Sequence, residues 1–138
     1  MTKNFNHKIK IYYEDTDAGG VVYYANYLKY LERARTEALV DIGFSNQKIK
    51  EYFKALIIVK SCNIDFKKSA ILEDELIIRS HIISISKTSF VMEQTIIKKK
   101  DTLVEAKVHL VFVNDKIKPI KIPEIILNKL APYISNTK

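Results

Sequence analysis

The sequence predicts a single α+β domain in which one long helix packs against an antiparallel sheet. At 138 residues the chain has the length of one ordinary domain, so we expect a single domain over residues 1–138. The chain is 47% hydrophobic and 28% charged, with three Gly and three Pro, which is typical of a compact folded protein. The apolar pattern indicates one strand, one long helix and then a series of strands.

The long helix is predicted from the apolar residues between Ala25 and Ile42. They recur at helical spacing, and Gly43 follows as a C-terminal stop. The expected core-facing positions are Leu28, Leu31, Ala34 or Arg35, Ala38, Leu39 and Ile42. Before the helix, Lys8 to Tyr13 alternates lysine with isoleucine, which predicts a half-buried first strand.

Four more strands are expected after a short helical or irregular piece around Ser45 to Phe53. They span Leu56 to Phe66, Glu75 to Ser86, Ser89 to Lys99 and Leu103 to Asn114. Short connections favour antiparallel neighbours, and every second residue from Val104 to Phe112 is apolar, so one face of the last strand belongs to the core. An extended tail then leads to a short helix near Glu124 to Tyr133. We expect the long helix to cross the concave face of the sheet.

The net charge of +7 comes mainly from lysines, which make up 20 of the 23 basic residues and are spread along almost the whole chain. Such a surface attracts anions of any kind, including nucleic acids and phosphorylated small molecules. The only dense basic run, Lys98 to Lys100, looks like a turn between two strands. We therefore expect no nucleic-acid partner.

The single cysteine, Cys62, excludes an internal disulfide and fits a reducing compartment, so we expect a cytoplasmic protein. No stretch approaches the roughly 20 apolar residues of a membrane span, and we expect neither a signal peptide nor an integral membrane segment. The histidines His7, His81 and His109 lack metal-ligand spacing, so they are interpreted as structural and no metal is predicted.

The residues that carry chemistry concentrate between Tyr13 and Tyr27, where the first strand leads into the helix. Adjacent Gly19 and Gly20 permit positive φ and let a ligand approach the backbone closely. The free N–H groups at a helix start can hold an oxygen that gains negative charge. Acidic side chains just before this helix supply a base or nucleophile, and together these groups suit acyl transfer.

Residues 13–37, YEDTDAGGVVYYANYLKYLERARTE, resemble the signature of the 4-hydroxybenzoyl-CoA thioesterase family. Within that family they are most similar to the bacterial acyl-CoA thioesterases encoded beside the Tol–Pal system. The resemblance implies the hot-dog fold, a five-stranded antiparallel sheet wrapped around one long helix. It also implies hydrolysis of a short-chain or aromatic acyl-CoA, no cofactor other than the coenzyme A of the substrate, and a homodimer or homotetramer.

The same resemblance assigns roles to single residues. Asp17 matches the catalytic aspartate, acting as nucleophile or general base, and Tyr24 matches the position whose backbone N–H polarises the thioester carbonyl. Gly20, Val21 and Asn26 match substrate-binding positions of the motif. Asp15 is interpreted as structural, and Glu32 is a minor rival catalyst. The Tol–Pal-associated relatives usually have histidine in place of Tyr24, which puts the preferred acyl group in doubt more than the reaction.

Further substrate contacts are expected from two segments outside the motif. Lys60 and Ser61 lie on the strand that lines the cleft in the family, and Lys87, Thr88 and Ser89 match a turn near coenzyme A. The lysines of the tail between Lys118 and Lys121 could meet its phosphates. Two alternatives remain open, namely a hot-dog module that binds acyl groups or a partner without catalysis, and a thioesterase that acts on acyl carrier protein.

Overall fold

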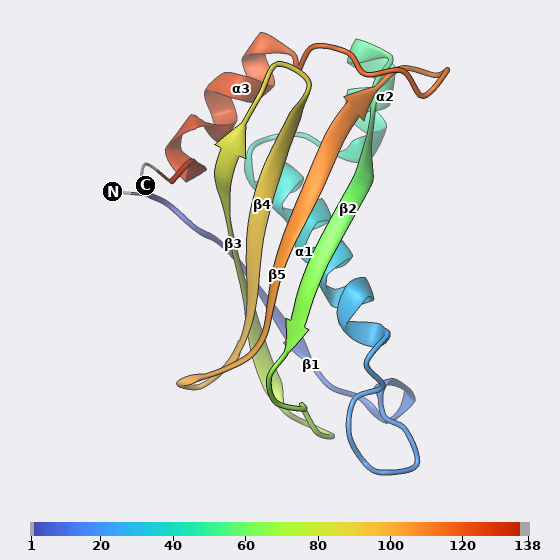
Figure 1. Ribbon diagram of the computed structural model, residues 1–138, viewed down its shortest axis with the longest axis vertical. Coiled ribbons are helices and arrows are strands. Elements are labelled where there is room, and N and C mark those ends of the chain that lie inside the picture. The colour runs from blue at the N-terminus through green and yellow to red at the C-terminus, as the bar shows by residue number, and fades with distance from the viewer. Residues whose placement is uncertain (1, 136–138) are drawn as a thin grey trace.

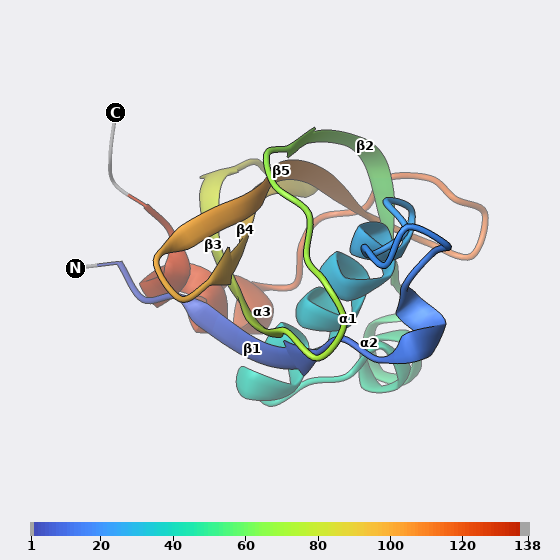
Figure 2. The same cartoon turned by 90° about the horizontal axis from the view of Figure 1, so that it is seen from below.

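Five antiparallel strands form one sheet in the order β1-β3-β4-β5-β2 in the computed structural model, which describes residues 2–135 (Figure 1). The strands are β1 (Phe5–Lys10), β2 (Leu56–Phe66), β3 (Glu75–Ile85), β4 (Ser89–Lys98) and β5 (Asp101–Val113). Seen from below, they form an arc from β1 to β2 around helix α1 (Asn26–Asp41) (Figure 2). This is the predicted α+β hot-dog arrangement. Residue 1 and residues 136–138 of the predicted domain lie outside the described residues.

Helix α1 buries a stripe at spacings of three and four residues, formed by Tyr27, Tyr30, Leu31, Ala34 and Ala38. The prediction of a core-facing Leu28 was wrong, because this residue lies one position off the stripe and is 49% exposed. The two tyrosines fill the core instead. The helix ends at Asp41, one residue before the predicted end, with Ile42 as its C-cap, and Gly43 follows with φ +92°.

Two shorter helices lie at the upper end of the molecule as seen in Figure 1. In α2 (Asn46–Phe53) the side chain of Ser45 accepts a hydrogen bond from the Lys48 N–H at 3.0 Å, which is the usual N-terminal cap. Helix α3 (Glu124–Leu130) buries Ile126 and Leu130 and continues into the short turn η2 (Ala131–Tyr133). Both helices lie where the sequence predicted a helical piece.

The first strand differs from its prediction, since β1 ends at Lys10 and not at Tyr13. Beyond it, residues Tyr13–Asp15 form a 3-10 turn, η1, in which the Asp15 carboxylate accepts a hydrogen bond from the Tyr12 N–H at 2.9 Å. The chain therefore turns before it reaches Asp17, because the local bond to the Asp15 carboxylate competes with an extended backbone.

The predicted inner face of β5 is confirmed, and its alternate residues Val104 to Phe112 are all buried. One polar network crosses this core. The fully buried Gln94 of β4 donates from Nε2 to the Leu31 carbonyl at 3.1 Å and to Ser80 Oγ at 3.1 Å, and its Oε1 accepts from Arg35 Nη1 at 3.0 Å. These bonds tie α1 to β3 and β4 and fix the rotation of the helix on the sheet. Within residues 2–135, no helix is long and apolar enough to cross a membrane.

Candidate active site

The segment that joins β1 to α1 folds into a small hairpin at the lower end of the molecule as seen in Figure 1. Thr16 and Val22 form an antiparallel bridge, and the Asp17 N–H donates to the Val21 carbonyl at 2.9 Å. The tip is a four-residue turn in which the Gly20 N–H donates to the Asp17 carbonyl at 3.0 Å, and Gly20 takes φ +82°. Glycine adopts this conformation without steric cost, so the predicted role of the glycine pair in shaping the turn fits the geometry.

The carboxylate of Asp17 is exposed, and only one of its two oxygens accepts a hydrogen bond from the described residues. Its Oδ1 accepts a hydrogen bond from the Gly19 N–H at 2.8 Å, whereas Oδ2 has no hydrogen bond among the described residues. A Cβ atom at Gly19 would lie 3.2 Å from Oδ1, which is a crowded contact. One oxygen is therefore held in place and the other is free to act on a ligand.

The start of helix α1 is fixed to the chain just before Asp17. The carbonyl of Asp15 accepts from the Tyr23 N–H at 3.0 Å and from Asn26 Nδ2 at 2.9 Å. The backbone N–H groups of Tyr24 and Ala25 find no acceptor in the described part of the chain, and no side chain caps the helix there. The helix start therefore offers free N–H groups where the carbonyl-polarising role was predicted, while the Asn26 amide nitrogen is already used inside the loop.

A buried phenol lies beneath this loop. Tyr30 is 2% exposed, and its hydroxyl has no hydrogen-bond partner among residues 2–135. Burial raises the pKa of this phenol, and the neighbouring carboxylate of Asp15 raises it further. Asp15 therefore serves the local structure through both its carbonyl and its carboxylate, which agrees with the structural role expected for it.

Exposed aromatic rings border the helix start. The ring of Tyr24 lies edge-on to Phe66, the last residue of β2, with centroids 6.0 Å apart, and it is also in contact with Tyr23 at 5.1 Å. These three side chains are 47–62% exposed. The sequence analysis did not single out Phe66. The sequence placed Phe66 at the end of a predicted strand, but this position does not show which loop the ring contacts.

A cavity of about 160 Å³ lies between α1 and the sheet. Its walls include the buried side chains of Phe90, Met92 and Leu110. Polar groups of α1 enter it from one side, and burial lowers the pKa of Arg35, while Glu32 acts in the opposite direction. The cavity can hold an apolar group about the size of a benzene ring.

Glu32, the rival catalyst, lines this cavity and does not belong to the Asp17 hairpin. Its Oε2 accepts a hydrogen bond from Thr36 Oγ1 at 2.6 Å, one helical turn further on. Six residues separate it from Asn26 at the helix start, which corresponds to about 9 Å along the axis. Its carboxylate is therefore engaged away from the free N–H groups.

The remaining predicted substrate contacts lie away from Asp17 within one chain. Lys60 occupies a bulge in β2, and Ser61 pairs in register with His109 of β5. The turn that carries Lys87 and Thr88 lies at the upper end of Figure 1, opposite the Asp17 hairpin. His109 Nε2 lies 3.0 Å from Ser89 Oγ, so a histidine interpreted only as structural connects the two predicted segments. Strand register could have revealed this link.

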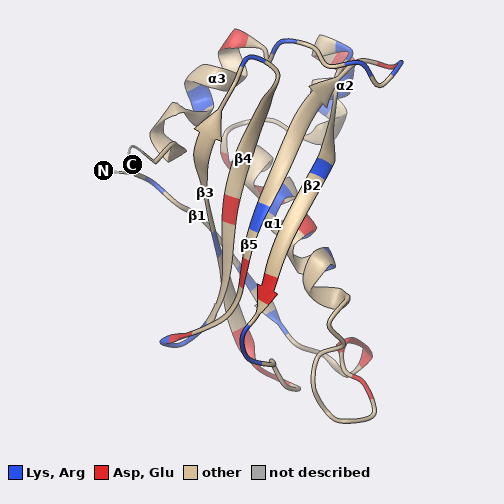
Figure 3. Ribbon diagram, viewed as in Figure 1, with Lys and Arg blue, Asp and Glu red and all other residues tan. Residues whose placement is uncertain are grey.

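The C-terminal tail passes along the same turn. The Ile122 N–H donates to the Lys87 carbonyl at 2.8 Å, and the Phe112 N–H donates to the Thr88 carbonyl at 2.9 Å. Lys121 therefore lies one residue along the chain from the bond to Lys87, whereas the carbonyl of Lys118 accepts a hydrogen bond from the Asn114 N–H at 2.9 Å. Elsewhere, lysines and arginines are scattered over many elements and mixed with acidic residues (Figure 3).

No group of three or more His, Cys, Asp or Glu residues within the described residues is placed to hold a metal ion. The thiol of Cys62 is free and exposed on β2. His81 Nε2 lies 3.8 Å from Glu93 Oε1 on neighbouring strands.

Comparison with known proteins agrees with this architecture. A family model described as the thioesterase-like superfamily matches residues 12–130. The chain is 35% identical over 125 residues to the acyl-CoA thioesterase YbgC of Haemophilus influenzae, covering 90% of this chain and 92% of that protein. It is 40% identical over 128 residues to the acyl-CoA thioester hydrolase YbgC of Escherichia coli O6:H1, covering 91% and 95%.

A solved structure of 4-hydroxybenzoyl-CoA thioesterase complexed with 4-hydroxybenzoyl-CoA is similar to this chain with a TM-score of 0.87, covering 92% of this chain and 98% of that one. The sequence identity is 20%, so this likeness concerns the fold alone. The match to the family model covers more than half of the chain, and both relatives exceed 30% identity over most of their length. The chain therefore belongs to the thioesterase-like superfamily and has its hot-dog fold.

Proposed function

We propose that this protein hydrolyses the thioester of a short-chain or aromatic acyl-CoA to the free acid and coenzyme A. The two relatives above are acyl-CoA thioester hydrolases by name. The observation that carries the proposal is the pairing of a half-engaged Asp17 carboxylate with the free N–H of Tyr24 in one short hairpin. These are an acid–base group and a donor for a developing oxyanion.

In the proposed reaction the Tyr24 N–H, at the positive end of α1, holds the thioester carbonyl oxygen. Oδ2 of Asp17 either takes a proton from a water that adds to the carbonyl carbon or attacks that carbon itself. In both routes the carbon–sulfur bond breaks and the sulfur leaves as the thiol of coenzyme A after protonation. In the first route the added water supplies the second oxygen of the acid, whereas in the second route a water molecule cleaves the acyl–Asp17 anhydride, which releases the acid and restores the carboxylate. The bond from the Gly19 N–H to Oδ1 orients the carboxylate for either role.

The substrate would use both ends of the molecule. Coenzyme A carries phosphates, which suit the lysines around Lys87 and the tail, whereas the thioester must reach Asp17. Strand β4 has 10 residues and is therefore about 33 Å long, and it separates the two ends in one chain. A second subunit offers a way to bring an Asp17 end and a Lys87 end together.

Strand β2 is the expected contact between subunits. Among the described residues it pairs only with β5, and its side chains Leu56, Val59 and Phe66 are 37–48% exposed. A two-fold axis across two antiparallel β2 strands would set the Asp17 end of one chain beside the opposite end of its partner. We therefore propose a homodimer, which can pair further into a homotetramer, with the substrate bound between subunits.

The 160 Å³ cavity beside α1 supports the short-chain or aromatic choice, since a cavity of this size holds one benzene-sized group. The reaction requires only substrate and water, so we propose that no cofactor or metal takes part. A free exposed thiol at Cys62 persists in a reducing compartment, which favours the cytoplasm.

The test is release of free thiol from a panel of short-chain, long-chain and aromatic acyl-CoAs, with Asp17→Asn beside the wild type. Asp41→Asn is the matched control, because Asp41 is an exposed aspartate at the other end of α1. We expect Asp17→Asn to lower kcat about 100-fold or more, the size of a positioned base or nucleophile. Asp41→Asn should leave kcat unchanged, and circular dichroism and sedimentation should show equal folding and assembly.

Other results would point elsewhere. If Asp17→Asn keeps full activity, Asp17 is not the catalyst and Glu32→Gln becomes the next variant to measure. If the wild type binds acyl-CoA without turnover, the protein is a binding module or acts on acyl carrier protein, which a parallel assay with acylated carrier protein separates.

A further inference from the structure

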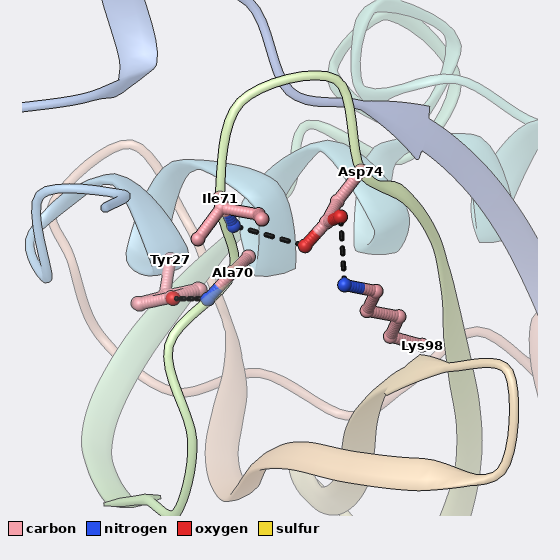
Figure 4. A network of polar contacts seen from close by, with 5 residues as sticks. All are labelled: Tyr27, Ala70, Ile71, Asp74 and Lys98. Atoms are coloured by element: carbon pink, nitrogen blue, oxygen red, sulfur yellow. Dashed lines mark hydrogen bonds and ion pairs between the residues drawn. The ribbon is translucent and has the colours of Figure 1, made fainter. Parts of the chain in front are cut away.

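The turn of residues 70–74, between β2 and β3, holds the Asp17 hairpin from its C-terminal side. The Val22 N–H donates to the Ala70 carbonyl at 2.9 Å, and Val21 forms a bridge with Ile71. The Ala70 N–H donates to the Tyr27 hydroxyl at 2.9 Å, which adds a bond to α1 (Figure 4). The position of the hairpin therefore depends on the shape of this turn.

The same turn holds the chain that leads into the hairpin from β1. The Ile11 N–H donates to the Asp74 carbonyl at 3.0 Å, and the Glu73 N–H donates to the Ile11 carbonyl at 2.9 Å. The second strand of the hairpin and the chain just before the hairpin are thus both bonded to one five-residue turn, on either side of Asp17.

The carboxylate of Asp74 is built into this turn. It is 9% exposed, its Oδ2 accepts from the Ile71 N–H at 2.9 Å, and its Oδ1 lies 2.8 Å from Lys98 Nζ (Figure 4). Lys98 is the last residue of β4, and its charge offsets the burial of the carboxylate. Glu73 takes φ +69°, a conformation that non-glycine residues adopt at an energetic cost, so the bonds of Asp74 help to hold a turn that is strained on its own.

We propose that Asp74, with Lys98 as its counter-ion, is a positioning residue for Asp17. Its carboxylate fixes Ile71 and thereby the turn, the turn holds Val21 and Val22, and Val22 bridges the residue before Asp17. Neither Asp74 nor Lys98 contacts the proposed reacting groups. The inference rests on the proposed function, because it assumes that Asp17 carries out the chemistry.

Two exposed ion pairs in the same connection provide a contrast. Lys67 lies 3.1 Å from Glu105 and Lys68 lies 3.4 Å from Asp101, with all four side chains about half exposed. Surface pairs of this kind contribute little to structure. Lys68→Met therefore removes an ion pair from the same loop without touching the turn.

The experiment compares Asp74→Ala, Asp74→Asn, Lys98→Met and Lys98→Arg with Lys68→Met and Ile126→Val. Ile126 is fully buried in α3, so Ile126→Val lowers stability away from the hairpin. The measurements are kcat and KM at a temperature at which every variant is fully folded, together with hydrogen exchange at the backbone amide of Val22. The exchange measurement does not depend on catalysis.

We expect Asp74→Ala to lower kcat about 100-fold, the size seen when a catalytic group moves by about 1 Å, with KM within about threefold. Asp74→Asn keeps one acceptor oxygen, so its kcat should fall less than that of Asp74→Ala. The kcat of Lys98→Met should fall about tenfold, and Lys98→Arg should keep most of the wild-type kcat. The Val22 amide should exchange faster in Asp74→Ala and Lys98→Met. Lys68→Met and Ile126→Val should change neither kcat nor the exchange at Val22.

The proposal is overturned if kcat in Asp74→Ala stays at the wild-type level, whether or not Val22 exchanges faster. It is also overturned if Ile126→Val loses as much kcat as Asp74→Ala, because general destabilisation would then explain the loss. A failure of the proposed function is distinguishable, because Asp17→Asn would then keep its activity. In that case the exchange of the Val22 amide still tests the positioning role, and unchanged exchange in Asp74→Ala would reject it.

Discussion

The Asp17 hairpin and the Lys87 turn are the two loops in which the sequence predicts catalytic and substrate-binding residues, and they lie at opposite ends of the sheet (Figure 1). Both are anchored by backbone bonds from distant segments, the hairpin by residues 70–74 and the Lys87 turn by the C-terminal tail. They differ in charge, because one presents an exposed carboxylate and the other lysines. The comparison teaches that the proposed catalytic carboxylate and the proposed phosphate-binding lysines lie at opposite ends of one chain, so in the proposed homodimer each site would combine one end of each subunit.

The largest expected effect comes from separating the subunits of the proposed homodimer, which would leave these two ends apart. Val59→Lys places a charge in the middle of the exposed edge of β2, and a lysine repels its symmetry mate across a two-fold axis. We expect a monomer with kcat/KM lowered roughly 100-fold, because each proposed site would lose the groups supplied by its partner. Val59 also lines the cavity beside α1, so a loss of activity in a variant that keeps the wild-type mass would be an effect on that cavity and not on assembly. Light scattering gives the mass and thiol release gives the activity.

The control for this variant is Ile125→Lys, since Ile125 is 50% exposed on α3, away from β2. It should keep both the mass and the activity of the wild type. A fully active monomer of Val59→Lys would contradict the proposal that each site combines two subunits, because a single chain would then be sufficient for catalysis.

A smaller effect is expected at the basic end. Lys87→Ala and Lys121→Ala each remove one exposed cation, and an exposed charge pair contributes about 0.2–1 kcal/mol. KM for acyl-CoA should therefore rise about 1.4- to fivefold in each variant while kcat stays constant. The increase should shrink at high salt, since exposed charges are screened. Lys10→Ala, on the edge strand β1, is the control. A fall in kcat without a change in KM would contradict a binding role for this turn.

The smallest effect concerns the phenol under the Asp17 hairpin. The pKa of Tyr30 is raised in the folded protein, so above pH 10 the folded state keeps a proton that the unfolded state releases. Stability should therefore fall as the pH rises above about 10, by about 1.4 kcal/mol per pH unit from this group. Tyr30→Phe should lack this contribution and should unfold at pH 7 within about 1 kcal/mol of the wild type.

Urea unfolding at pH 7 and between pH 9 and 11 measures the difference between these two proteins. The other tyrosines and the lysines titrate in both, so they cancel in the comparison. Equal alkaline slopes for wild type and Tyr30→Phe would show that the hydroxyl is not shielded beneath the hairpin.

Local patterns were sufficient to predict most of the fold. Strand β2 has the predicted bounds, and the alternate apolar residues of β5 face the core because a strand that is half buried must alternate. The motif also located the hairpin, since two adjacent glycines and an aspartate before a helix form a recognisable turn. These features depend on neighbours in the sequence.

What the sequence could not reveal depends on contacts between distant residues. The 3-10 turn at Tyr13–Asp15 arises from a side-chain bond that a strand pattern cannot anticipate. Leu28 was wrongly placed on the buried stripe of α1, because tyrosines fill the core there. The link between Ser61, His109 and Ser89 needs the register of three strands. The role of residues 70–74 in holding the hairpin needs the full topology.

The strand order also determines when each part of the molecule can form. Strands β3, β4 and β5 follow one another in hairpins, whereas β1 must find β3 across about 70 residues, as in the pair Phe5 and Ser80. Closing a loop of that length costs chain entropy before any contact is gained, so the three-strand meander should be structured in the folding transition state and β1 should join later. The Asp17 hairpin hangs between β1 and α1 and is bonded to the 70–74 turn, so it should become ordered in the last steps of folding and open first when the native state fluctuates.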